Sequence, residues 1–144
     1  MANRLIDTQV AQNSSTTGSI GIPLTAAPVL FGTLGLNTAA AGPDLQVQYT
    51  ATATVSSTLA VVAPVVVSIF RVVSGVSTPI FSLTETVPIG TLALATVSLS
   101  VNGIDFQPPN PGFIVYQAFI SAPGLVLFPT RVGPESFRAV AYSD

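Results

Sequence analysis

Three carboxylates are the residues of this sequence best suited to chemistry: Glu85, Asp105 and Glu135. Two carboxylates can share general acid and general base roles when the fold brings them together. No pairing is visible in the sequence, and histidine, lysine and cysteine are all absent. A serine nucleophile also needs a neighbouring base. We therefore expect no catalytic residues and predict that the chain is not an enzyme.

Metal binding is not expected either. Without cysteine and histidine, zinc and the softer ions lose their usual ligands. Calcium could bind through Asp105, Asn102 and backbone carbonyls, but the sequence contains no Asp-rich calcium loop. Asn102 is better explained as a turn residue. We expect no metal and no cofactor.

The chain carries very little charge. Charged residues make up 7% of its 144 residues, and the net charge is -2. Four dispersed arginines cannot build the basic face that nucleic acids require. Arg131 and Glu135 flank Gly133-Pro134, and their spacing predicts a local contact that staples this loop. A nearly uncharged surface favours self-association. The alternative is a monomer whose exterior consists of Thr, Ser, Gln and Asn.

Residues 22–144 show the sequence pattern of β-strands throughout. These strands must position the groups named above. Leu45 to Val55 alternates apolar and polar residues over eleven positions, which is typical of a half-buried strand. The nearly continuous run Val65 to Val73 predicts a strand buried on both faces. Other runs predict strands at 28–36, 79–87, 91–101, 113–121, 125–129 and 136–142.

Turn signals separate these runs. Asn102-Gly103 predicts a hairpin turn into Ile104–Phe106. Three prolines at 107–112 cannot continue a strand ladder. No segment shows a helical apolar stripe with caps. The expected fold is therefore all-β, an antiparallel jelly-roll sandwich of about eight strands with an extended N-terminal arm.

Residues 1–20 differ in composition from residues 21–144, so we predict an N-terminal arm followed by one sandwich domain. The stretch NSSTTGS at 13–19 is typical of a flexible link. Sheet edges have unpaired backbone groups that an added strand can satisfy. The arm is therefore expected to dock on a neighbouring copy, a contact that builds filaments when it does not close. Its expected anchors are the apolar residues Leu5, Ile6, Val10, Ile20 and Ile22.

Three segments resemble a known group of proteins. They are PGFIVYQAFIS at 111–121, GPESFRAVAYSD at 133–144, and the middle segment containing APVVVSIFRVVSG. The chain resembles small spore-surface proteins of Bacillus and its relatives, among them exosporium components, endospore appendage subunits and the head of the exosporium nap glycoprotein. The resemblance covers most of residues 25–144 through short motifs.

The resemblance implies a jelly-roll subunit, comparable to tumour-necrosis-factor-like trimers, that stacks through N-terminal connector peptides. It places the protein on the spore surface, in the exosporium or an appendage, with other spore-surface proteins as further partners. Synthesis without a signal peptide fits this location, since no apolar stretch follows MANRLID. Appendage connectors are cross-linked by cysteines, and this chain has none. Any fibre that it builds is expected to be noncovalent.

Two other functions share these sequence features. A phage or viral jelly-roll protein, such as a capsid, decoration or fibre component, has the same expected fold and low charge. A trimeric receptor- or sugar-binding head predicts a discrete homotrimer. No membrane span is expected, because the most apolar run, Leu59 to Phe70, is too short and contains Pro64.

Overall fold

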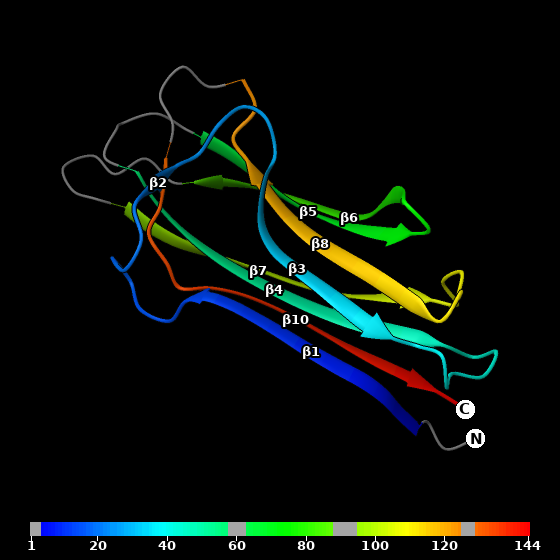
Figure 1. The fold of residues 1–144 in the computed structure, drawn as a ribbon. Coiled ribbons are helices and arrows are strands. Elements are labelled where there is room, and N and C mark those ends of the chain that lie inside the picture. Colours follow the sequence, from blue (N-terminus) through cyan, green and yellow to red (C-terminus); the bar gives the residue numbers. More distant parts are fainter. Residues whose placement is uncertain (1–3, 58–62, 88–94, 125–128) are drawn as a thin grey trace.

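The computed structural model describes residues 4–57, 63–87, 95–124 and 129–144. In these ranges the chain forms two antiparallel sheets that lie face to face (Figure 1). No helix in the described ranges is long and apolar enough to cross a membrane. The strands are β1 (Arg4–Ser14), β2 (Ile22–Pro23), β3 (Val29–Asn37), β4 (Gln46–Ser57), β5 (Ala63–Val73), β6 (Val76–Val87), β7 (Ala95–Phe106), β8 (Phe113–Ser121), β9 (Thr130–Arg131) and β10 (Glu135–Ser143).

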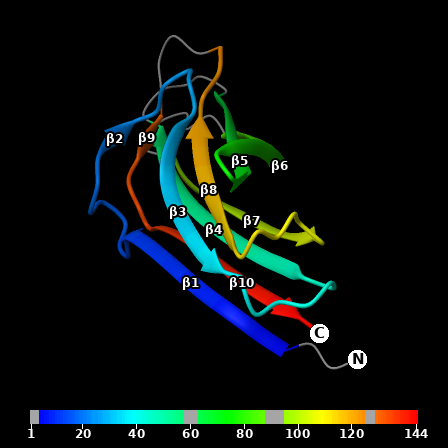
Figure 2. The ribbon, with the colours of Figure 1, turned by 45° about the vertical axis from the view of Figure 1, so that its right-hand side comes forward.

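The strand order is that of a jelly roll. The larger sheet places β1, β10, β4 and β7 side by side, and the two-residue strands β9 and β2 extend the pairing of β4. The smaller sheet has the order β3-β8-β5-β6. β5 and β6 form a hairpin within the smaller sheet, whereas the other long strands that lie side by side in a sheet are distant in sequence (Figure 2). The predicted fold class, an antiparallel jelly-roll sandwich, is confirmed.

Strict alternation along the strands decides which side chains form the core. Ile114, Tyr116, Ala118 and Ile120 of β8 are fully buried, and the residues between them are half-buried. The inward side chains of β4 and β10 meet this row from the other sheet, as a two-layer sandwich requires.

The prediction that β5 is buried on both faces is wrong. Val65, Val67 and Ile69 are buried in the core, whereas Val66 and Phe70 are half-buried on the outer face. Within the described residues no third layer covers that face. Phe70 instead packs edge-on against Phe119 of β8, with ring centroids 5.3 Å apart.

Most predicted strands coincide with observed ones, and β8 has the predicted bounds. Residues 91–94 and 125–128, which belong to two other predicted strands, lie outside the described residues.

The predicted hairpin turn at Asn102-Gly103 is wrong, because β7 runs straight through both residues. Gly103 lies opposite Tyr49 on β4, and a side chain at Gly103 would collide with the Tyr49 ring. The glycine therefore leaves room for a large neighbour in the core, and no turn is formed. A local turn signal was overridden by a packing requirement between strands.

The structure places residues 4–14, which the sequence assigned to an arm outside the domain at 21–144, within the larger sheet of the same chain. They form β1, the first strand of the jelly roll, and they pair with β10 (Figure 1). Residues 15–19 that follow are exposed.

Candidate assembly surface

β1 forms one edge of the larger sheet. Its pairing with β10 extends from Arg4 opposite Ser143 to Ser14 opposite Glu135, with register shifts after Leu5 and after Gln12. Among the described residues no strand pairs with the opposite flank of β1. Backbone groups along that flank are therefore unpaired within the described residues, and the two register shifts interrupt their regular spacing.

The five predicted anchor residues lie on β1 and just after it. Leu5 and Val10 are exposed on the outer face, at 56% and 63% of their full surface. Ile6 points inward and packs against the core. Ile20 is half-buried in the connection to β2, and Ile22 on β2 is exposed. Of the five, Ile6 alone packs against the hydrophobic core, where Ala11 joins it.

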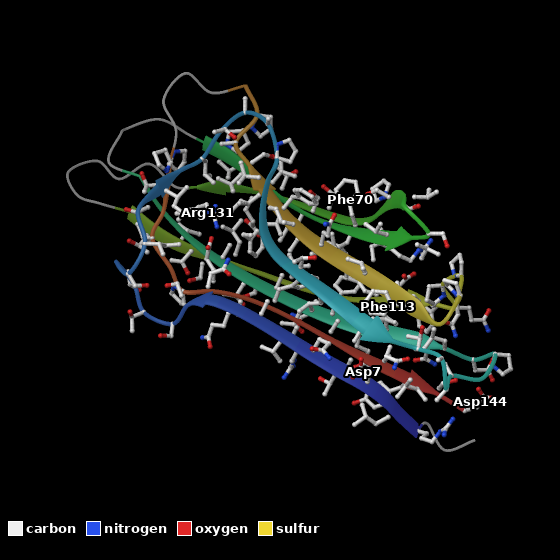
Figure 3. The ribbon with its side chains drawn as sticks, viewed as in Figure 1. Asp7, Phe70, Phe113, Arg131 and Asp144 are labelled. Carbon is white, nitrogen blue, oxygen red and sulfur yellow. The ribbon has the colours of Figure 1, made fainter. Side chains whose placement is uncertain are left out.

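Polar side chains of β1 also reach the other sheet. The Asn37 N–H of β3 donates to Asp7 Oδ2 over 2.8 Å, and Asn13 Nδ2 donates to the Phe31 carbonyl. Figure 3 shows Asp7 on β1 beside the end of β3. These bonds satisfy backbone groups on the free edge of β3, so β1 closes one side of the sandwich. The sequence contains no signal for this role, because it depends on where β3 lies.

The connection after β1 is short and exposed. Residues 15–19 are all exposed, and the Gly18 N–H donates to the Val132 carbonyl over 2.8 Å. The hydroxyls of Ser14 and Ser19 bond to each other. The connection therefore packs few apolar atoms against the sandwich, and rearranging it would expose little apolar surface.

A charged cluster on β5, β7 and β8 joins the two sheets. Arg71 Nη1 on β5 donates to both oxygens of Asp105 on β7, over 2.7 and 2.8 Å. The Tyr116 hydroxyl on β8 donates to Asp105 Oδ2 over 2.8 Å. No local sequence pattern connects these three residues, because 34 positions separate Arg71 from Asp105.

The predicted contact between Arg131 and Glu135 is confirmed. Arg131 Nε and Nη2 donate to the two carboxylate oxygens of Glu135, over 2.7 and 2.6 Å. Both side chains are buried, at 5% and 0% exposure, so the pair that staples this loop is a buried ion pair. Figure 3 shows Arg131 inside the end of the sandwich where β2 and β9 meet.

Comparison with family models and with curated protein sequences finds no match. Among solved structures, a chain of infectious bursal disease virus, Gx strain, is similar with a TM-score of 0.51 and 10% identity. The match covers 97% of this chain and 32% of the viral chain, so this protein spans about a third of that chain's length. At this identity the similarity shows the fold alone.

A second solved structure, the enzymatically active domain of tailspike protein 4 of bacteriophage CBA120, has a TM-score of 0.33 and 15% identity. The match covers 99% of this chain and 18% of the tailspike chain. This likeness is too weak to carry an argument.

Of the three candidate carboxylates, two form ion pairs. Asp105 and Glu135 are each held by an arginine, and Glu85 lies exposed on β6. The described residues contain no group of three metal-ligating side chains. The polar groups inside the sandwich thus bond to one another and hold strands together.

The cluster at Asp105 predicts a pH dependence. Burial and the Asp105 carboxylate raise the pKa of Tyr116 above its ordinary value of about 10. Above that pH the unfolded chain loses the tyrosine proton while the folded chain keeps it, so the free energy of unfolding falls as pH rises.

Urea unfolding between pH 8 and pH 11 measures this fall. Tyr116→Phe keeps the ring and removes the ionising group, so its stability should decline less steeply than that of the parent chain. An equal slope in both proteins would contradict the assignment.

Proposed function

We propose that this protein is a non-catalytic structural subunit that assembles noncovalently with copies of itself. In an isolated chain, β1 pairs with β10 of the same chain. In the assembly, β1 of one copy pairs instead with β10 of the next copy. The position of β1 supports this proposal. It is an edge strand held mainly by backbone pairing, and an exposed connection joins it to the rest of the chain.

Exchange of β1 costs little because the same bonds form in both arrangements. The β1 to β10 pairs and the bonds of Asp7 and Asn13 to β3 are identical within one chain or between two. The balance then depends on strain in the connection and on protein concentration. Each copy gives one strand and accepts one, so exchange that does not close builds a filament.

We assign this assembly to a fibre or layer on the spore surface, built with or without intermediate trimers. Support for the location comes from the resemblance of segments 111–121 and 133–144 to spore-surface proteins. The absence of cysteine makes the joint noncovalent.

Cysteine cross-linking tests the exchange directly, because the natural chain contains no cysteine. Val10 and Arg138 are directly paired and exposed. Paired Cα atoms in antiparallel strands lie within disulfide range. Mixing the single variants Val10→Cys and Arg138→Cys should give a disulfide-linked dimer under mild oxidation. Replacing Arg138→Cys by Gln48→Cys, one strand further away on β4, should not.

The double variant supplies the complementary measurement. When Val10→Cys/Arg138→Cys is oxidised as a dilute monomer before assembly, the disulfide locks β1 onto its own sandwich. Fibres should then be absent from electron micrographs after the protein is concentrated, and they should form once the disulfide is reduced. Fibres that persist in the oxidised, fully locked protein would overturn the exchange mechanism.

A second candidate is a viral or phage jelly-roll structural protein. The fold shared with the infectious bursal disease virus chain favours it. Antibodies against the purified chain distinguish the two settings. Gold labelling of spore surfaces supports the first candidate, and labelling of virus particles supports the second.

A further inference from the structure

Beside the two-residue strand β2, four long strands lie at the edges of the two sheets among the described residues, and three of these four have features that block further pairing. β1 has two register shifts. β3 has one shift, and the side chains of Asp7 and Asn13 occupy its free edge. β6 contains Pro79, next to a shift in its pairing with β5. Bulges, prolines and covering groups are the usual means by which proteins protect sheet edges.

β7 lacks such protection. Its pairing with β4 is unbroken over its whole length, from Phe106 opposite Gln46 to Ala95 opposite Ser57. It contains no proline, and its one charged residue, Asp105, is bonded to Arg71 and Tyr116. Among the described residues no strand pairs with its other flank. A long, regular and uncharged edge is a template for another strand.

Among the described residues, three inward apolar side chains beside this edge are only half-buried. Val97 of β7 points inward but is half-buried, as are Phe81 and Leu83 on the neighbouring edge strand β6. On the opposite side of the sandwich, β1 and β3 close the gap between the sheets. Added apolar surface along β7 would therefore extend the core at this side.

The sequence of β7 identifies the partner. Residues 97–101 read Val-Ser-Leu-Ser-Val, the same in both directions about Leu99. In an antiparallel pair of identical strands centred on Leu99, Val97 meets Val101 and Ser98 meets Ser100. The outward pair continues with Thr96 opposite Asn102. Valine therefore faces valine on the inner face, and small polar residues face each other on the outer face. No like charges are placed opposite each other in these pairs.

We infer that β7 pairs antiparallel with β7 of a second copy, about a twofold axis through Leu99. The contact is isologous, and it joins the two larger sheets into one continuous sheet. It goes beyond the proposed exchange of β1, which it neither requires nor prevents, since the two edges lie at opposite ends of the sheet.

Cross-linking measures both the contact and its register. Ser98 and Ser100 are exposed on the outer face. A mixture of Ser98→Cys and Ser100→Cys chains should yield a disulfide-linked dimer, because each residue faces the other in the second copy. Each variant alone should yield at least about tenfold less, because identical positions are offset by two residues.

Two matched charge variants supply an independent measurement. Ser98→Lys/Ser100→Lys opposes two lysines across each pair and should lower the dimer fraction in sedimentation by at least about tenfold at low salt. Ser98→Lys/Ser100→Glu opposes lysine to glutamate and should keep the dimer. Both variants lose the contact between Ser98 and Thr54, so this loss cancels in the comparison.

The outcomes separate this inference from the proposed function. A failed cross-link between positions 98 and 100, together with a successful one between 10 and 138, overturns the β7 contact and leaves the exchange standing. Strong cross-linking of either variant with itself overturns the Leu99-centred register. Equal dimer fractions in the two charge variants would also overturn it.

Discussion

Removing residues 1–14 should destabilise the whole sandwich, with a loss of at least about 4 kcal/mol in the free energy of unfolding. Deletion leaves one flank of β10 unpaired along nine positions, while its other flank stays paired with β4. It also removes Ile6 and Ala11 from the core edge and unpairs the Asn37 N–H of β3. A loss of this size is a large fraction of the total stability of a domain. An arm outside the domain could be deleted at almost no cost.

A synthetic peptide of residues 1–14 should restore stability to the truncated chain in proportion to its concentration. It rebuilds the same strand from a separate molecule, and binding to the folded state raises the free energy of unfolding by mass action. A peptide carrying Ile6→Asp is the matched control, because a carboxylate at this inward position opposes docking. Urea titrations at several peptide concentrations make the measurement. An unaltered unfolding midpoint in the truncated chain would contradict the role of β1.

Replacing either member of the buried Arg131 and Glu135 pair should cost about 3–5 kcal/mol, because the remaining charge stays buried without a partner. Each carboxylate oxygen of Glu135 now accepts one N–H from Arg131. Arg131→Met and Glu135→Leu each leave one charge uncompensated in the core. The double variant removes both charges and should recover most of the loss, since apolar replacements of similar volume are often neutral.

A double-mutant cycle in urea at pH 7 measures this coupling. Glu85→Gln is the control, because Glu85 is exposed on β6 and its replacement should change stability by less than about 0.5 kcal/mol. If the losses from Arg131→Met and Glu135→Leu simply add in the double variant, the pair does not act as a unit.

The two proposed contacts have different symmetry, and this limits what they can build. Exchange of β1 is heterologous and propagates in one direction, whereas pairing through β7 is isologous and stops at two copies. Together they would join filaments in pairs along the larger sheet. A variant that blocks β7 pairing should therefore leave single filaments.

Local patterns were sufficient to predict most strands and the class of fold. Alternation in 45–55 and 113–121 sets which residues face the core, because side chains of a strand point to opposite faces in turn. The contact of Arg131 with Glu135 was also predictable, because they are four positions apart and a tight loop joins them.

Contacts between distant segments were not predictable in this way. Asn102-Gly103 has the composition of a turn, yet Gly103 makes room for Tyr49 on a different strand. Asp105 looked like an isolated carboxylate, yet β5 and β8 bring Arg71 and Tyr116 to it. In both cases the deciding neighbour is fixed by strand order.

By itself the sequence determined an all-β sandwich with few charges, because side-chain period and composition are local properties of the chain. Tertiary structure decided which strands and side chains are neighbours. It places β1 against β10 and β3, Asp105 between the two sheets, and β7 at an edge where no described strand pairs with its outer flank. The physical reason is that a jelly roll pairs strands far apart in the chain. Which edges are covered and which stay open is then a property of the strand order, and no segment carries it alone.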